Sequence, residues 1–252
     1  MITAGRDLYD DPHFFEGYRR LKDSGAGINE AVEIPPMSRM LPPLAGAAVV
    51  DLGCGAGALA RRLADAGAAN VVAVDSSQQM LALAAPHPRV RYLRADLDEL
   101  TLPARSRRPG RQQPGAALRR RLPGAGPARH ALAAAGWTVR PLDRTPHLHG
   151  RRSDDRMAEN RRGHGMGGRR LAAEGPRTQN WIIEGVEKHH RQVATLIGGL
   201  LSAGLELTGI DEPVPGPATL QRHPHLAEHL RRPPLLVLGT RRGHVDPASR
   251  EE

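Results

Sequence analysis

The sequence has few of the features that cross-link a chain or carry it into a membrane. Cys54 is the only cysteine among 252 residues, which excludes a disulfide within the chain and indicates a reducing compartment. No stretch approaches the roughly 18 uninterrupted apolar residues of a membrane-spanning helix. Residues 1–12 lack the apolar core of a signal peptide. We therefore expect a cytoplasmic protein without a membrane partner, of a length that suits one α/β domain.

Lysine is also scarce, and the positive charge is unevenly distributed. Only two of the 36 basic residues are lysines, and the net charge is +9. Residues 104–170 hold 17 arginines against four acidic residues, a net charge of +13, whereas the remaining 185 residues carry a net charge of −4. Because most of the chain is mildly acidic, a nucleic-acid partner is not favoured. A nucleic-acid binder that acts through residues 104–170 remains an alternative.

Apolar runs alternate with helix-forming runs over residues 47–96. Three runs have the length and composition of buried strands, and two helical patterns separate them. In chain order we expect a strand over 47–52, a glycine cluster over 53–57, a helix over 58–66, a strand over 70–75, a helix over 77–85 with Ser76 as its N-cap, and a strand over 90–96. This order predicts a Rossmann-like α/β fold, a doubly wound parallel sheet with right-handed crossovers.

This pattern stops after Pro103. Residues 104–170 contain one apolar β-branched residue, Val139, and no phenylalanine, tyrosine or isoleucine, which is typical of disordered or low-complexity chain. Ordered patterns return near Thr178. Outside the arginine-rich segment we expect helices over 13–21, 28–40 with an interruption at two prolines, 181–201 and 220–230, and strands over 205–211 and 234–240.

The expected chemistry lies where the strands end. Gly53, Gly55 and Gly57 allow the backbone to turn sharply and to approach a ligand, and the helix that follows presents free N–H groups. Asp75 ends the second expected strand, where a carboxylate can accept the ribose hydroxyls of an adenosine, and Asp96 ends the third. Because parallel strands share one carboxyl edge, we expect a nucleotide-cofactor site there.

Three motifs resemble one family. Residues 49–57, Val-Val-Asp-Leu-Gly-Cys-Gly-Ala-Gly, resemble the glycine motif of class I S-adenosylmethionine-dependent methyltransferases of the type 11-like group. Residues 71–80 resemble the second motif of that family and residues 94–97 the third. The resemblance covers residues 45–103 and, more loosely, 174–240. It implies S-adenosyl-L-methionine as the cofactor and methyl transfer as the activity.

The resemblance also implies roles for individual residues. It assigns the methionine part of the cofactor to Asp51, Gly53, Gly55 and Gly57, the ribose to Asp75 with Ser76 beside it, and the adenine to Met80, Asp96 and Leu97. It points to no catalytic residue and no metal, since in-line methyl transfer is accelerated mainly by proximity and alignment. We expect a small-molecule acceptor, because no basic surface outside residues 104–170 could hold nucleic acid. The oligomeric state is left open.

A nicotinamide enzyme is the nearest alternative. The glycine cluster also satisfies G-x-G-x-x-A, with Asp75 about 20 residues further on, which is typical of NAD(P)-dependent oxidoreductases. The acidic residue before the glycines, the third glycine and Asp96 favour the methyltransferase. His189 and His190, on the expected long helix, are the other candidates for a base, although a polar helix face is the simpler interpretation.

The resemblance requires two more central strands where the chain becomes arginine-rich. We hypothesise that residues 104–171 are translated out of frame, because of their composition and because residues 111–119, 127–137 and 144–150 can all be back-translated so that reading from the second base gives text similar to the family's. Residues 111–119 give VSSLALHY, similar to the family's fourth strand. Strands 4 and 5 are then expected to be disrupted, residues 49–52 to lose a ladder partner, and this chain to be poorly folded or inactive. A genuine arginine-rich insertion is the alternative.

The expected division of the chain follows from these patterns. Residues 1–44 form an N-terminal helical segment or lid, 45–103 the cofactor-binding half-domain, 104–171 the irregular segment, and 172–244 a helix and strand pair that complete the same domain. Tyr9, Phe14 and Tyr18 either cover the cofactor as part of that lid or belong to an ordinary core.

Overall fold

The computed structural model describes residues 8–23, 32–97, 99–100, 115–119, 138–143, 173–231, 233 and 235–242, with the backbone alone for 115–119, 138–143, 179, 188, 189 and 242. The helices are η1 (Leu8–Asp10), α1 (Pro12–Asp23), α2 (Ile34–Met40), α3 (Ala58–Asp65), α4 (Gln78–Ala82), α6 (Val193–Ser202), α7 (Pro217–Arg222) and η4 (Pro224–Leu230). The strands are β1 (Ala48–Leu52), β2 (Asn70–Asp75), β3 (Val90–Arg94), β4 (Gly115–Arg119), β5 (Thr138–Asp143), β6 (Gly175–Trp181), β7 (Ile183–His190), β8 (Leu205–Asp211) and β9 (Leu236–Arg242).

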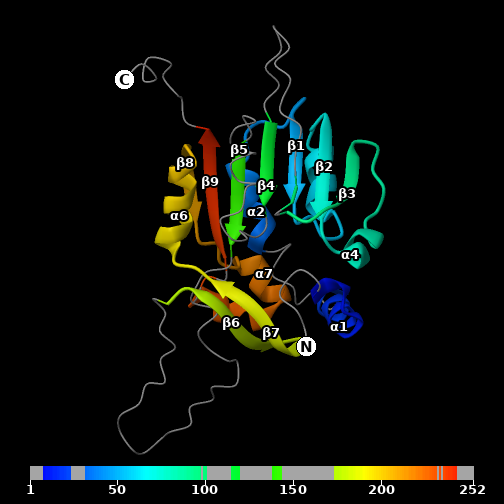
Figure 1. Ribbon diagram of the computed structural model, residues 1–252, viewed down its shortest axis with the longest axis vertical. Helices are drawn as coiled ribbons and strands as arrows, with labels where there is room; N and C mark the ends of the chain where they lie inside the picture. The colour runs from blue at the N-terminus through cyan, green and yellow to red at the C-terminus, as the bar shows by residue number, and fades with distance from the viewer. Residues whose placement is uncertain are drawn as a thin grey trace, which may run out of the picture.

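Seven strands form one sheet in the order β3-β2-β1-β4-β5-β9-β8. The first five are parallel to one another, and β9 runs antiparallel to both of its neighbours. The order reverses between β1 and β4, so the chain winds outward in both directions from the centre (Figure 1). This confirms the doubly wound α/β fold, and each expected strand of the sheet lies within two residues of its predicted position.

The centre of the sheet departs from the expectation of disrupted strands. Residues 115–119 form β4, which pairs in parallel with β1 over its whole length, and residues 138–143 form β5, which pairs with β4. The prediction that residues 49–52 lose a ladder partner is therefore wrong, because β1 is hydrogen-bonded on both sides. Apart from these two strands, the segment 104–171 lies outside the described residues.

Two apolar clusters cover the two faces of the sheet. Successive residues of β1 face opposite sides of the sheet, so Val49 joins the cluster that α2 and α3 complete, whereas Val50 and Leu52 join the cluster that α6 completes through Leu196. This division is what the buried, near-continuous apolar runs of the sequence require. Within the described residues, no helix has the length and apolar character needed to cross a membrane.

Residues 181–201 are not the single long helix that the sequence predicted. Residues 175–190 form the antiparallel hairpin β6–β7, and the helix α6 begins only at Val193. Ile183 and Val186, whose spacing suggested one helix face, lie on β7. There they pack with Leu8 and Phe14 near the N-terminus, so a tertiary contact rather than helical periodicity explains their apolar character.

We call residues 8–23 and 175–190 together the outer layer. It lies across the edge of the sheet at which the parallel strands end (Figure 1). Aromatic rings join its two parts, since the ring of Phe14 lies 5.1 Å from that of Tyr9 and 5.3 Å from that of Trp181, centroid to centroid. These aromatic residues therefore form a small core of their own, beyond the carboxyl ends of the strands.

Candidate cofactor site

The turn after β1 is built on glycine conformations. Gly53, Gly55 and Gly57 have φ angles of 77°, 56° and 71°, which residues other than glycine rarely adopt. The backbone amides of Gly53 and Cys54 donate to the carbonyl of Val74, at 2.7 and 2.9 Å. The loop is thus fixed against the end of β2 while it leads into α3.

Asp75 joins this glycine loop to the next one. Its carboxylate accepts a hydrogen bond from the amide of Gly55 at 2.7 Å through Oδ2 and one from the amide of Ser77 at 2.9 Å through Oδ1. Each carboxylate oxygen has two lone-pair sites, so both can accept a further donor from a ligand. Asp75 therefore sets the geometry of the site and retains the capacity to bind hydroxyl groups.

The other two acidic residues lie near the same edge. Asp51 is fully buried in β1, opposite Ala73 of β2. Because Asp75 lies two residues beyond Ala73, strand alternation directs both carboxylates to the same face of the sheet. Asp96 is half-buried two residues past β3, whereas Leu97 packs against the cluster on the opposite face.

The predicted N-cap of α4 is shifted by one residue. Ser77, not Ser76, occupies this position, and its hydroxyl accepts a hydrogen bond from the amide of Met80 at 3.1 Å. The carbonyl of Ser76 instead accepts from the guanidinium of Arg94. Met80 is buried on the first turn of α4.

Asp10 is a residue of this site that was not predicted from the sequence. Its carboxylate accepts from the Ser77 hydroxyl at 2.6 Å and from the amides of Gln79 at 3.1 Å and Gln78 at 3.3 Å. Arg94 lies 3.6 Å away. Burial acts to raise the pKa of Asp10, but the hydrogen bonds from Ser77, Gln79 and Gln78, with the charge of Arg94, together hold it below its ordinary value of 3.8.

Tyr92 of β3 is a second residue that was not predicted. Its ring lies directly against the α-carbon of Gly57, where any Cβ would collide with it. Its hydroxyl donates to the carbonyl of Ala85 at 3.0 Å and accepts from the guanidinium of Arg61 at 3.3 Å. The third glycine is thus required both by its φ angle and by this ring.

The histidine pair does not form a helix face. His189 and His190 lie at the end of β7, and the side chain of His190 is 1% exposed. The interpretation of the pair as a polar helix face is therefore wrong, because the expected helix is a strand there.

Known proteins share both this sequence pattern and this fold. Residues 49–107 match a family described as a methyltransferase domain. The chain is 31% identical to an S-adenosylmethionine-dependent methyltransferase from Mesorhizobium loti, over 86% of this chain and 100% of that one, with a TM-score of 0.68. The chain belongs to the class I S-adenosylmethionine-dependent methyltransferase family.

Two further relatives extend over most of the methyltransferase. A protein from Listeria monocytogenes, described as S-adenosylmethionine-dependent, is 23% identical over 89% of this chain and 100% of its own, with a TM-score of 0.64, and so shares the fold. An uncharacterised protein of Haemophilus influenzae is 26% identical over 93% of this chain and 96% of its own. The match therefore includes the C-terminal third as well as the motif region.

The cofactor of this methyltransferase is S-adenosylmethionine, and the nicotinamide alternative is set aside. The residues at the strand ends fit that molecule, because a turn of three left-handed glycines adjoins carboxylates that can accept hydrogen bonds from amine and hydroxyl groups. The nucleic-acid alternative concerns side chains in 104–170, which lie outside the described residues.

Proposed function

We propose that this enzyme transfers the methyl group of S-adenosylmethionine to a small-molecule acceptor, with the cofactor lying across the ends of β1, β2 and β3. The methionine part is assigned to Asp51, Gly53, Gly55 and Gly57, the ribose to Asp75 and Ser76, and the adenine to Met80, Asp96 and Leu97. In this proposal residues 45–103 bind the cofactor, residues 1–44 cover it, and residues 172–244 complete the same domain.

The observation that carries the assignment is the position of Asp75. Its carboxylate is fixed by the amides of Gly55 and Ser77, one from each of the two loops that would embrace the cofactor. A fixed carboxylate with unused acceptor sites is suited to two adjacent ribose hydroxyls, since it needs no reorganisation on binding.

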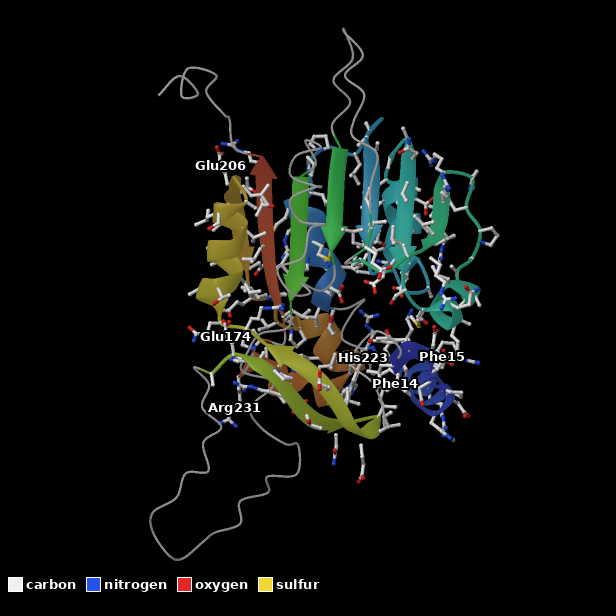
Figure 2. The ribbon with its side chains drawn as sticks, in the orientation of Figure 1. Phe14, Phe15, Glu174, Glu206, His223 and Arg231 are labelled. Atoms are coloured by element: carbon white, nitrogen blue, oxygen red, sulfur yellow. The ribbon has the colours of Figure 1, made fainter. Side chains whose placement is uncertain are left out.

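Methyl transfer requires the protein mainly to hold the cofactor and the acceptor in the right relative position. When bound, S-adenosylmethionine would supply an electrophilic methyl group on its sulfonium to an acceptor held in line with the methyl–sulfur bond. Holding the two molecules in this geometry provides most of the acceleration. The outer layer lies over the same edge of the sheet and would exclude water from it (Figure 2).

A small acceptor is supported by the charge distribution. Outside residues 104–170 the chain carries a net charge of −4, and nucleic-acid binding depends on many lysine or arginine contacts to phosphates. Incubation with methyl-labelled S-adenosylmethionine and a fractionated cell extract tests this. We expect label in the low-molecular-weight fraction, and label only in RNA or protein would contradict it.

Calorimetric titration of the full chain tests the site. We expect binding of S-adenosylmethionine and its demethylated product, and none of NAD. Asp75→Ala should weaken binding about 10- to 100-fold, the range that loss of hydrogen bonds to a charged group produces. Asp211→Ala is the matched control, because Asp211 also ends a strand but pairs with Arg39 at the far edge of the sheet, and it should bind as wild type. Equal affinities for both variants would overturn the assignment.

A further inference from the structure

The N-terminal segment is attached to the cofactor site through one side chain. Asp10 belongs to η1, yet all the donors to its carboxylate lie 67 to 84 residues later in the chain, on Ser77, Gln78, Gln79 and Arg94. In addition, the side-chain amide of Gln79 donates to the backbone carbonyl of Asp10 at 2.6 Å. The contact therefore involves both the side chain and the backbone of η1.

These hydrogen bonds continue without a break to the glycine loop. The Ser77 hydroxyl donates to Asp10, the Ser77 amide donates to Asp75, and Asp75 also accepts from the amide of Gly55. Three carboxylate or hydroxyl groups thus connect the outer layer to the turn after β1. A displacement of η1 would remove the acceptor of Ser77 and loosen the element that holds Asp75.

The helix α4, whose first amides donate to Asp10, depends on hydrogen-bond acceptors from outside the helix. α4 has five residues, and a helix this short is unstable on its own because few intrahelical bonds offset the cost of nucleation. Its first amides need acceptors from outside the helix. Asp10 supplies acceptors to Gln78 and Gln79, and Ser77 supplies one to Met80.

We propose that Asp10 is a positioning residue for the cofactor, and that docking of residues 8–23 and binding of S-adenosylmethionine stabilise each other through Asp10, Ser77 and Asp75. The proposal rests on the assignment of Asp75 to the ribose. By linkage, a cofactor that binds more tightly to the docked form must itself favour docking by the same factor. Asp10 does not contact the reacting atoms in this proposal.

Titration calorimetry with S-adenosylmethionine on the full chain provides the first test. Asp10→Ala should weaken binding about tenfold, the factor that loss of a helix N-cap produces. Asp10→Asn should stay within about threefold of wild type, since asparagine caps helices nearly as well as aspartate. Glu16→Ala is the control on the same segment, because Glu16 makes only an exposed pair with Arg20, and it should not change the affinity.

Tryptic cleavage in α1 provides a measurement that general destabilisation would not reproduce. Arg19 and Arg20 are cleavage sites on the docked segment. S-adenosylmethionine at saturation should slow cleavage there in the wild type, in Asp10→Asn and in Glu16→Ala, but not in Asp10→Ala. Cofactor protection of equal size in Asp10→Ala would overturn the proposal.

The Asp75 variant separates the two hypotheses. If Asp75→Ala binds S-adenosylmethionine as tightly as wild type, the site assignment itself is wrong. If Asp75→Ala binds weakly while Asp10→Ala binds as wild type, the site stands and the positioning role of Asp10 is overturned. Circular dichroism of each variant shows whether it is folded. If Asp10→Ala is unfolded, the comparison of Asp10→Asn with the wild type still tests the proposal.

Discussion

Gly57 and Gly46 have the same φ angle of 71° but different surroundings. A Cβ on Gly57 would collide with the ring of Tyr92, whereas nothing lies within 4 Å of a Cβ on Gly46. Both substitutions to alanine cost the strain of a left-handed conformation, about 1–2 kcal/mol. Gly57→Ala should cost a further 1–3 kcal/mol or so for overpacking, measured as the free energy of unfolding in urea.

The same pair of variants separates stability from binding. Gly46→Ala leaves the loop after β1 untouched, so its affinity for S-adenosylmethionine should equal that of the wild type. Gly57→Ala should bind the cofactor more weakly, because the loop must shift away from Tyr92. Equal affinities would show that the third glycine serves folding alone.

At the same scale, Asp10 makes the stability of the methyltransferase sensitive to low pH. Its pKa in the folded protein lies below the ordinary 3.8, so its contribution to stability is fully present above that value and is lost as the pH falls through the folded pKa. The stability advantage of wild type over Asp10→Asn should therefore be constant near neutral pH and shrink below about pH 4. Urea titrations of both proteins over that range measure it, and a difference that does not change with pH would contradict the prediction.

At the scale of elements, the hairpin and α1 meet at Gly17. A Cβ on Gly17 would collide with Cγ2 of Ile182, and Ile182 occupies the turn of the hairpin with a φ of 63°, a strained conformation for a β-branched residue. Gly17→Ala should therefore destabilise the protein by about 1–3 kcal/mol, as urea unfolding would show.

Gly198 provides the opposite case on another helix. It lies within α6 with nothing within 4 Å of a Cβ, so Gly198→Ala should stabilise the protein by about 0.5–1 kcal/mol through helix propensity. Adding Ile182→Gly to Gly17→Ala should recover the loss, since it removes the collision and the strained φ together. If both alanine variants are stabilised alike, the close contact of α1 with the hairpin is wrong.

For the molecule as a whole, the sequence predicted the parts that local pattern determines. The strands β1 and β2 are largely buried and read as continuous apolar runs, and the glycines at 53, 55 and 57 mark the turn that follows β1. The helix predicted over residues 181–201 was wrong at its start, because Ile183 and Val186 are apolar for contact with Phe14, 169 or more positions away. A pattern read over a short stretch of sequence cannot detect a contact between residues so far apart in the chain.

The site divides in the same way. Asp51, Asp75 and Asp96 could be selected because each lies at or next to the last residue of an expected strand. Asp10 could not, because its partners are far along the chain and its neighbours in sequence give no motif. Ser76 was predicted as the N-cap in place of Ser77 because either serine satisfies the capping pattern. Only the hydrogen bond from the amide of Met80 to the Ser77 hydroxyl distinguishes them.

The last prediction concerns the two central strands, β4 and β5, and the hypothesis that their sequence is translated out of frame. β4 brings Arg119 to the position opposite Leu52, which is 1% exposed, and β5 brings Arg140 and Pro141 beside β4. Central parallel strands favour Val, Ile and Leu, and proline cannot donate to a ladder. Residues 115–119 and 138–143 thus have the backbone pairing of the fold with a sequence ill-suited to it, which is what translation out of frame would produce.

A chain with residues 104–171 translated from the second base of the same gene should therefore be more stable. Exchanging these residues for apolar ones removes several unfavourable groups, and each 1 kcal/mol raises Tm by about 2–4 °C in a protein of this size. We expect a gain of about 10 °C or more in a calorimetric melt, with a further rise on adding S-adenosylmethionine. The present chain should melt with low cooperativity and gain less from the cofactor. If the gene instead shows the arginine-rich text in one uninterrupted frame, and this chain melts cooperatively with a clear rise on adding the cofactor, the segment is a genuine insertion.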